Sequence, residues 1–461
     1  MMKKQEDVSK TKTSVNPIFT TKLGVLLVTL GSAVGLGNIW KFPALAGMNG
    51  GAAFVLIYLL CALVLGLPVM LAEHAMGREG RKDVIGTMQK LAPKSLWWVI
   101  GAIGVLAAFL IMAFYSEVAG WVVAYIGKAV TLGKLSTDPA TNGQIFTDLV
   151  TDPVQSLVWQ WVVLLATGVI IALGVVKGIE ATIKRSLPLL FLLLMIVIVR
   201  SVTLPGAAAG LEFLFKPDWS KVTFTTVLTA LGLAFFKLSV GMGCMMTYGS
   251  YFRKDQNIPV TATRIVLLDL LISIMAGLAI FPAVFALGFE PTAGASLLFI
   301  TIPAVFASMP FGNFFMIIFF VLTALAATGA ILSLLEVITA YLENNFKLKR
   351  VTAAAVTISG VALFGVPAAL SNSATSNWLV FGKTFFDLYD YVTSNILLTV
   401  GGLLIAVFVG WVWKYPNLAT QLSNQGELKN EKVSKFFFFM LKFVTPVLIF
   451  LILLSGFGLV K

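Results

Sequence analysis

Long runs of apolar residues, separated by short polar links, divide the chain into about eleven segments. A helix needs about 20 apolar residues to cross the hydrocarbon core of a bilayer. The predicted spans are approximately 23–48, 51–76, 96–127, 157–176, 185–203, 223–251, 262–289, 311–342, 351–370, 384–413 and 435–459. The pattern therefore predicts an all-α polytopic membrane protein. The stretch 291–310, which contains three prolines, is too short and interrupted to span and is expected to form an outer lid loop.

Glycines interrupt two of these spans near their middle. The first span contains Gly31-Ser-Ala-Val-Gly-Leu-Gly-Asn38, and the sixth contains Lys237-Leu-Ser-Val-Gly-Met-Gly243. A helix unwinds most easily at glycine, and the amides freed at the start of a half-helix attract anions. Broken spans five apart predict two inverted five-helix repeats with a substrate site between them near the midplane. We assign 1–13 to a disordered cytoplasmic tail, 14–203 and 223–413 to the repeats, and 435–461 to a peripheral helix.

Composition agrees with a lipid environment, since 58% of the 461 residues are hydrophobic and 12% are charged. The net charge of +12 suggests nucleic-acid binding until the charges are located. Most Lys and Arg residues lie in the N-terminal tail and in the links after even-numbered spans, which is the positive-inside pattern. We therefore expect a multi-pass protein of the cell membrane, with a cytoplasmic N-terminus, an extracellular C-terminus and no nucleic-acid partner.

Lys237 lies more than ten residues from either end of the sixth apolar run, too far to reach an interface easily. A charged side chain at that depth faces a cavity or a partner. The seventh span carries Asp269, the only acidic residue between Asp255 and Glu290.

The chain lacks a Walker loop, a His-Glu-x-x-His motif and any nucleophile–base spacing, so neither an enzyme nor a nucleotide-driven pump is expected. No cofactor or metal site is predicted. A transporter and a transporter-like membrane sensor remain as alternatives, while a channel would need rings of charge that the sequence lacks.

The motifs closely resemble the neurotransmitter:sodium symporter family and its leucine-transporter fold over nearly the whole chain. The motifs that carry the resemblance are Gly31 to Pro43, Asn49-Gly-Gly51, Gly66 to Glu73, Lys177-Gly-Ile-Glu180, Leu231 to Phe236 and Tyr248 to Gln256. Bacterial members of this kind usually end after eleven spans.

The resemblance implies a small-molecule site at the two breaks. The amides of Leu36 and Gly37, with the Tyr115 hydroxyl, would face a carboxylate. Carbonyls near Ala33 and Phe236, with the Ser239 hydroxyl, would face an amine. An apolar substrate side chain would contact Ile111, Phe236, Met242 and Leu334.

The resemblance also implies two gates. Lys41 and Asp390 match the outer gate pair of the family, and Phe236, with Phe114 more loosely, would close the outer lid. The inner gate pair, usually Arg and Asp, is Asn16 and Asn344 here.

Both sodium sites depart from the family pattern. The first sodium would be held at positions matching Ala33, Asn38, Lys237 and Asp269, where a hydroxyl residue and an asparagine have become Lys and Asp. The second would be held at Gly31, Val34, Ala326, Gly329 and Ala330, where two hydroxyl residues are missing. Shifting the alignment by one residue places Thr328 at one of these positions but leaves Gly329 at the other.

We therefore expect the Lys237 ammonium to replace the first sodium, with Asp269 as its counter-charge. The hypothesis is a carrier without sodium coupling. The pair either stays ionised, giving a uniporter or exchanger, or exchanges a proton during the cycle, giving proton coupling. A sodium-coupled symporter remains the alternative.

The apolar pocket positions favour a small hydrophobic α-amino acid. Repulsion between Lys237 and a substrate ammonium leaves a 2-oxo or 2-hydroxy acid as an alternative substrate. Tyr58 and Ser273 fall where chloride-dependent relatives bind chloride, but the neighbouring Gln position is Leu233, so chloride is not expected. The sequence does not indicate an oligomeric state.

Overall fold

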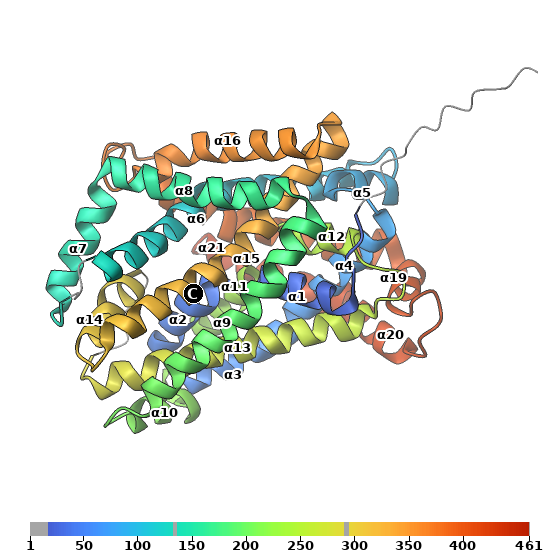
Figure 1. Cartoon of the computed structure of the whole chain (residues 1–461). Helices are drawn as coiled ribbons and strands as arrows, with labels where there is room; N and C mark the ends of the chain where they lie inside the picture. Colours follow the sequence, from blue (N-terminus) through green and yellow to red (C-terminus); the bar gives the residue numbers. More distant parts are fainter. Residues whose placement is uncertain (1–16, 132–135, 290–294, 461) are drawn as a thin grey trace, which may run out of the picture.

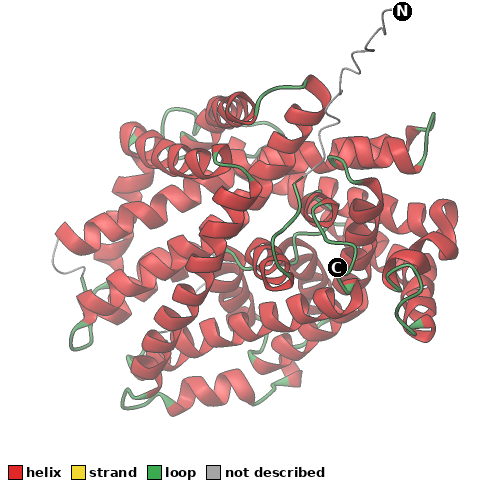
Figure 2. Cartoon of the chain, turned by 45° about the vertical axis from the view of Figure 1, so that its right-hand side comes forward, coloured by secondary structure: helices red, strands yellow, loops and turns green. Residues whose placement is uncertain are grey.

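The computed structural model describes residues 17–131, 136–289 and 295–460. Within these ranges the protein is almost entirely helical, with one isolated β-bridge between Val380 and Lys383 and no strand (Figures 1 and 2). The predicted tail 1–13 lies outside the described residues.

Nine of the described helical segments are long and apolar enough to cross a membrane. They are α3 (Ala52–Cys61) with η2 (Ala62–Gly66) and α4 (Leu67–Gly80); η3 (Leu96–Trp98) with α6 (Val99–Thr131); α8 (Pro153–Ala172); η4 (Val175–Glu180) with α9 (Ala181–Val202); α13 (Ile258–Ala286); α15 (Gly312–Phe346); α16 (Arg350–Ala369); α17 (Phe385–Tyr391) with η7 (Val392–Leu397), α18 (Leu398–Val407), η8 (Phe408–Trp413) and α19 (Lys414–Leu422); and α20 (Glu431–Phe439) with η9 (Met440–Val444) and α21 (Thr445–Gly456).

Two further spans are broken, as the glycine patterns predict. In the first, α1 (Lys22–Ala33) continues into η1 (Gly37–Lys41) and α2 (Phe42–Met48) through a bend of 54°. In the second, six non-helical residues separate α11 (Phe224–Lys237) from α12 (Cys244–Ser250). The first pair counts as a tenth span, and the short apolar helix α11 lies where the sequence predicts the sixth span.

Short helices occupy the links at both ends of the bundle. They are α5 (Val84–Leu91), α7 (Pro139–Thr151), α10 (Ala208–Phe215), η5 (Trp219–Lys221), η6 (Leu297–Thr301) and α14 (Ile302–Ala307). The expectation of a loop at 291–310 is therefore wrong for 297–307, which is helical. Pro303 lies in the first turn of α14, where a helix needs no amide donor, so it starts this helix instead of breaking it.

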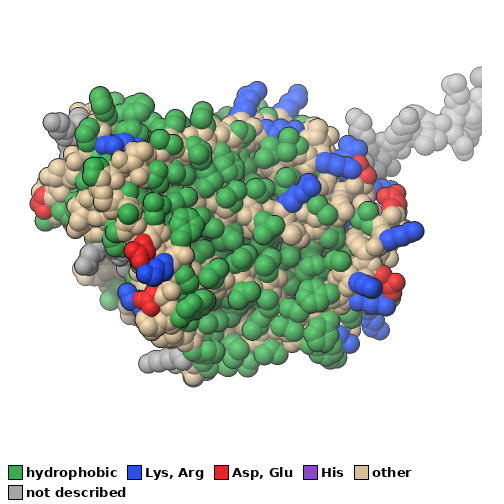
Figure 3. Space-filling model, turned by 90° about the horizontal axis from the view of Figure 1, so that it is seen from below, with side chains coloured by type: hydrophobic (Ala, Val, Ile, Leu, Met, Phe, Trp, Pro, Cys, Tyr) green, Lys and Arg blue, Asp and Glu red, His purple; other side chains and the backbone are tan. Residues whose placement is uncertain are grey.

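The two broken spans lie at the centre of the bundle. α1 packs against α9, α13 and α15, while α11 packs against α3, η2 and α21. Lipid-facing helices such as α9 and α16 have many exposed apolar side chains, including Leu192 and Leu363. Lys and Arg side chains gather mainly at the end of the molecule that carries α19 and α20 (Figures 1 and 3).

Candidate functional site

The two breaks face each other and are joined by hydrogen bonds. The Ser239 hydroxyl donates to the carbonyl of Ser32 at 2.8 Å, which links the second break to the first. Ser239, Gly241 and Gly243 have positive φ angles of 52°, 80° and 78°. Only glycine adopts such angles freely, so the two glycines are what allow the chain to leave the helix here.

Glu73 holds the second break open. It is fully buried in α4, and its two carboxyl oxygens accept from the amides of Gly241 at 2.6 Å and Met246 at 3.2 Å. These amides lack a helical partner because the helix is interrupted, so the carboxyl group satisfies donors that would otherwise be unpaired within the membrane.

A small cavity of about 30 Å³ lies between the breaks. It is lined by backbone of the first break, by α6, by the second break and by α15. The lining residues are Ser32, Ala33, Gly35, Gly37, Ile111, Tyr115, Phe236, Lys237, Ser239, Met242, Ala330 and Leu334. Eight of the nine substrate positions named above therefore line one cavity together with Lys237, which we also expect at the substrate site, and the ninth, Leu36, lines a small neighbouring cavity that includes Phe386 and Asp390.

Tyr115 anchors the first break from α6. Its hydroxyl accepts a hydrogen bond from the amide of Leu36 at 3.0 Å. A Cβ atom on Gly35 would lie 3.0 Å from that hydroxyl, so glycine is needed for this close approach. The amide of Leu36 and the Tyr115 hydroxyl thus point into one region, the one expected to meet a substrate carboxylate.

Lys237 and Asp269 form an ion pair with no solvent exposure. The Lys237 Nζ lies 3.1 Å from Asp269 Oδ2, and both side chains are 0% exposed. The ammonium also donates a short hydrogen bond to the Ser273 hydroxyl and lies over the rings of Phe42 and Tyr58, at 4.6 and 4.4 Å from their centroids. An ammonium is stabilised by carboxylate, hydroxyl and π-faces together, so the buried charge is well compensated.

The Asp269 carboxylate is satisfied by neutral donors as well. Asn38 Nδ2 donates to Oδ1 at 2.7 Å, and the Tyr58 hydroxyl donates to Oδ2 at 2.8 Å. Asn38 Oδ1 in turn accepts from the amide of Gly35 at 3.2 Å. The residues matched to the first sodium and to chloride therefore converge on one Lys–Asp pair.

The residues matched to the second sodium offer no side-chain oxygen. A Cβ atom on Gly329 would lie 2.3 Å from the carbonyl oxygen of Gly31, so α1 and α15 are in direct backbone contact there. The Thr328 hydroxyl donates to the carbonyl of Ala324 at 2.8 Å, within its own helix. With Val34, Ala326 and Ala330, these positions form a close-packed helix contact.

The three residues expected at the outer gate, Lys41, Asp390 and Phe236, lie together. The Lys41 Nζ lies 3.4 Å from Asp390 Oδ1 and 4.1 Å from the centroid of the Phe236 ring. Both gate side chains are about a third exposed, at 30% and 39%. The Phe114 ring packs edge-on against Phe386 at 5.5 Å.

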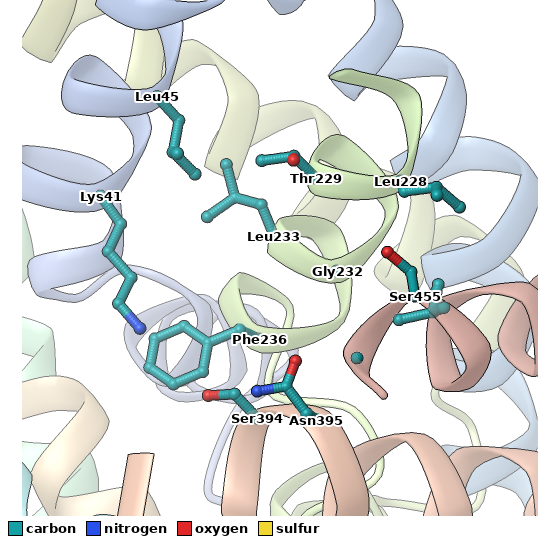
Figure 4. A pocket seen from close by; sticks show the side chains of 12 residues that line it. Lys41, Leu45, Leu228, Thr229, Gly232, Leu233, Phe236, Ser394, Asn395 and Ser455 are labelled. Atoms are coloured by element: carbon teal, nitrogen blue, oxygen red, sulfur yellow. The ribbon is translucent and has the colours of Figure 1, made fainter. Parts of the chain in front are cut away.

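On the other side of Phe236 lies a larger cavity of about 320 Å³, distinct from the two small ones described above. It is bounded by η1 and α2, α11, η7 and α21. Figure 4 shows Lys41 pointing toward the Phe236 ring at its inner wall, with Ser394 and Asn395 below them. This cavity and the central one share Phe236 as a wall, so that ring separates them.

A charged network that the sequence motifs did not predict lies between α15 and α16, close in sequence to Asn344, one of the two residues expected at the inner gate. Asn16 lies outside the described residues, and Asn344 lies near the end of α15. Beyond the end of α15, Arg350 forms a short ion pair with Glu336 and a 2.7 Å ion pair with Glu343. The Tyr251 hydroxyl also donates a hydrogen bond to Glu336 at 2.7 Å. An acidic residue inside an apolar span, Glu336, was the available signal.

Comparisons with known proteins agree with this geometry. The model of the Sodium:neurotransmitter symporter family matches residues 16–142 and 150–460. The chain is 39% identical over 443 residues to the uncharacterized sodium-dependent transporter YhdH of Bacillus subtilis, covering 96% of this chain and 98% of the relative. It is 36% identical over 452 residues to an uncharacterized sodium-dependent transporter of Haemophilus influenzae, covering 95% and 97%.

A solved structure is also similar. The crystal structure of MhsT in complex with L-phenylalanine aligns with a TM-score of 0.87 at 40% identity, covering 95% of this chain and 99% of that one.

Proposed function

The chain belongs to the sodium:neurotransmitter symporter family and has the leucine-transporter fold, and from this premise we propose a secondary transporter that works without sodium coupling. The proposed cargo is a small hydrophobic amino acid or related carboxylate, moved across the cell membrane by alternating access. The observation that carries the proposal is the buried Lys237–Asp269 pair at the position matched to the first sodium.

A fixed ammonium supplies the charge that a dissolved cation would bring. Sodium in a protein site must be surrounded by several oxygen atoms to replace its hydration shell. In this chain Asp269 faces Lys237, and the Asn38 side-chain oxygen is engaged by the amide of Gly35. The close backbone contact between Gly31 and Gly329 leaves no room for a side chain at the second position. The relatives from B. subtilis and H. influenzae are named sodium-dependent. The proposal therefore gives this chain a different ion dependence from the one in those names.

We assign the substrate contacts as follows. The amides of Leu36 and Gly37 and the Tyr115 hydroxyl receive a carboxylate, because amides at the start of a half-helix attract anions and the Leu36 amide already meets the Tyr115 hydroxyl there. The carbonyls near Ala33 and Phe236, with the Ser239 hydroxyl, receive an amine. Apolar atoms of the substrate meet Ile111, Phe236, Met242 and Leu334.

An α-amino acid fits this site better than an acid without an amine. The Lys237 ammonium already faces Asp269, Ser273 and two aromatic rings, so most of its charge is compensated before a substrate arrives. MhsT, which aligns over nearly the whole chain, was solved with L-phenylalanine. Competition of labelled amino-acid uptake by 2-oxo and 2-hydroxy acid analogues tests the assignment, and stronger competition by the analogues would reverse it.

Uptake into liposomes tests the absence of sodium coupling. We expect equal amino-acid uptake with sodium and with an inert replacement cation, and no sodium-driven accumulation. Lys237→Ala should abolish uptake while the protein stays folded. The control Lys216→Ala removes an exposed lysine and should transport like the wild type. Uptake by the wild type that rises steeply with sodium would refute the proposal.

The same liposomes distinguish three modes of action. If the pair stays ionised, uptake follows the substrate gradient alone and does not respond to an inward pH gradient. If the pair exchanges a proton, an inward pH gradient drives accumulation. A membrane sensor with this fold would bind a ligand without exchanging it in counterflow.

Chloride has no evident role at the matched position. The Tyr58 hydroxyl donates to the Asp269 carboxylate, and Ser273 accepts from Lys237. Asp269 thus occupies the place of an anion, as Lys237 occupies that of a cation. Replacing chloride with gluconate should leave uptake unchanged.

The proposed orientation has the N-terminus in the cytoplasm and the C-terminus outside. The basic end of the molecule, which carries α19 and α20, would then face the cytoplasm (Figure 3). Proteolysis of tags at the two termini in sealed vesicles tests this arrangement.

A further inference from the structure

Glu117 is a buried carboxyl group outside the central site. It lies two residues beyond Tyr115 in α6, and two residues correspond to roughly 200° around a helix. Tyr115 faces the central cavity, so Glu117 points to the opposite side, where α6 packs against α8 and α16 (Figure 1). Its side chain is 1% exposed.

The three helices approach closely around this residue. A Cβ atom on Gly120 would lie 2.9 Å from the backbone nitrogen of Gln160, so α6 and α8 are in backbone contact one turn beyond Glu117. A Cβ atom on Gly365 of α16 would lie 2.7 Å from Gln160 Nε2. Gln160 is therefore enclosed between α6 and α16, on the face of α6 that carries Glu117.

Two buried oxygen atoms at this junction lack a hydrogen-bond donor. Glu117 Oε1 accepts from the indole nitrogen of Trp121 at 2.7 Å, while Oε2 has no partner in hydrogen-bond geometry among the described residues. Among them, the donor beside Oε2 is the Ser156 hydroxyl, whose single proton is directed to the carbonyl of Val150 at 3.4 Å. Gln160 Nε2 donates to the carbonyl of Ala113 and the hydroxyl of Ser116, both at 3.2 Å, and Gln160 Oε1 has no partner either.

The amide orientation of Gln160 is fixed by its neighbours. The Ala113 carbonyl can only accept, and the Ser116 hydroxyl already donates to the carbonyl of Met112 at 2.7 Å. Turning the amide over would place its oxygen against both of these acceptors. The junction therefore has a surplus of acceptors and is short of a donor.

No cation near Glu117 supplies the missing charge. Among the described residues, α8 has no charged side chain, and the one charged residue of α16, Arg350, is bound to Glu336 and Glu343 at its far end. On α6 itself the other charged residue is Lys128, three turns away. α15 contributes Glu336 and Glu343, α17 contributes Asp387 and Asp390, and α5 contributes Lys90, and none of these is paired with Glu117.

We propose that Glu117 is a proton-binding site, held as the neutral carboxylic acid, whose proton supplies the donor that the α6–α8–α16 junction lacks. An ionised carboxylate without a cation at this depth is costly, whereas the neutral acid both removes the charge and donates one hydrogen bond. The proton comes from water and returns to water when Glu117 ionises.

Glu117 also connects this proton to the outer gate. The Trp121 ring, held by Glu117, stacks on Phe386 with centroids 5.8 Å apart and planes at 19°. Phe386 lines a separate small cavity of about 30 Å³ together with Phe236 and Asp390. Ionisation of Glu117 would strengthen the hydrogen bond from the Trp121 indole and so change how this ring is held against Phe386. The protonation state of Glu117 is therefore coupled to the aromatic wall beside the gate residues.

Infrared difference spectroscopy on the purified full-length protein tests the proton directly. The wild type minus Glu117→Gln spectrum at neutral pH should show the C=O stretching band of a protonated acid, displaced in D₂O. The matched control is Glu343→Gln, since Glu343 is paired with Arg350 and should lose only carboxylate bands. Carboxylate bands in the Glu117→Gln difference, like those of the control, would overturn the proposal. Failure of this variant to fold would also contradict it, because Gln is the neutral analogue of the acid.

Tryptophan fluorescence tests the connection to the gate. The chain has 10 Trp residues, so the Trp121 signal is taken as the difference between the wild type and Trp121→Phe. As the pH is raised, this difference should change in the wild-type background and stay constant in the Glu117→Gln background. An equal pH response in both backgrounds, or none in either, would show that Glu117 does not act on Trp121.

Discussion

Lys237 and Asp269 are tolerated at bilayer depth because each compensates the other. Neither side chain reaches solvent, and the atoms around them are hydroxyl groups, an amide and aromatic faces. A single buried charge would cost far more than the pair, because its desolvation would not be offset by attraction. The two substitutions therefore make physical sense only together.

A double-mutant cycle at this pair tests that dependence. Lys237→Met and Asp269→Asn should each destabilise the protein by roughly 3–5 kcal/mol, since each leaves one uncompensated buried charge. The double variant should lose clearly less than the sum of the two. Thermal unfolding in detergent measures all four proteins, and additive losses would mean that the two residues do not form a pair.

Gly329 tests whether the second sodium position can be restored. Gly329→Ser would bring Cβ to 2.3 Å from the Gly31 carbonyl oxygen, so we expect a loss of roughly 1–3 kcal/mol from overpacking and no gain of sodium dependence. Ala330→Ser is the matched control, because residue 330 lines the central cavity and has room for a hydroxyl. Sodium-stimulated uptake by Gly329→Ser would show that the site is latent.

At the scale of elements, the broken spans depend on a few backbone positions. α11 begins with a capping box formed by Thr223 and Thr226, and ends at Lys237 before a turn with left-handed residues. Glu73 of α4 holds the amides beyond the turn. Glycines within the broken segment create the break, and Glu73, from a span distant in sequence, stabilises it.

Two glycines of this span should respond in opposite ways to alanine. Gly241 has a φ of 80°, and its Cβ would lie 2.6 Å from the Leu398 carbonyl oxygen. Gly241→Ala should cost roughly 1–2 kcal/mol from the left-handed backbone alone, and more from the contact. Gly232 lies inside α11 with nothing within 4 Å of the Cβ position, so Gly232→Ala should stabilise by roughly 0.5–1 kcal/mol. Similar melting temperatures for the two variants would contradict this account of the break.

At the scale of the whole molecule, the two gates differ in strength. The outer pair, Lys41 and Asp390, is partly exposed, and such pairs contribute little. On the inner side Arg350 is bound by Glu336, which is fully buried, and by Glu343. Removing Arg350 would therefore leave a buried carboxylate without its cation, whereas removing Lys41 would not.

Loss of the inner network should expose the inner half of the molecule. In a Cys61→Ala background, the remaining cysteine is Cys244, which is 1% exposed at the start of α12. Arg350→Gln should raise the labelling rate of Cys244 by on the order of tenfold, the factor given by about 1.4 kcal/mol. Arg253→Gln is the control, because its pair with Asp255 is exposed. Equal labelling rates in the two variants would rule out Arg350 as an inner lock.

Much of the fold was predictable because it depends on local features. Span positions follow from apolar runs, and the two breaks follow from glycines that no straight helix favours. The Lys237–Asp269 pair was predictable for a related reason, since each is a rare charge inside an apolar span and must find a partner. The helix at 297–307 was not predicted, because three prolines within twenty residues are more typical of a loop than of a helix.

Contacts between distant spans were not predictable in the same way. Glu336 and Arg350 lie on different helices, and their pairing depends on how α15 turns into α16. The acceptor surplus around Glu117 arises only when Gly120 and Gly365 let α8 and α16 approach α6. A sequence shows that a group is buried, but its hydrogen bonds depend on the packing geometry.

The sequence by itself determined that this chain crosses a membrane many times, breaks two spans and buries a lysine and an aspartate inside apolar segments. Burial cost and glycine flexibility act locally, so residue order is enough to show them. Only the tertiary structure decided that Gly31 and Gly329 touch, that Arg350 pairs with Glu336, and that Glu117 Oε2 lacks a donor. Those facts depend on which helix faces lie together at distances of a few ångströms, and residue order alone does not specify them.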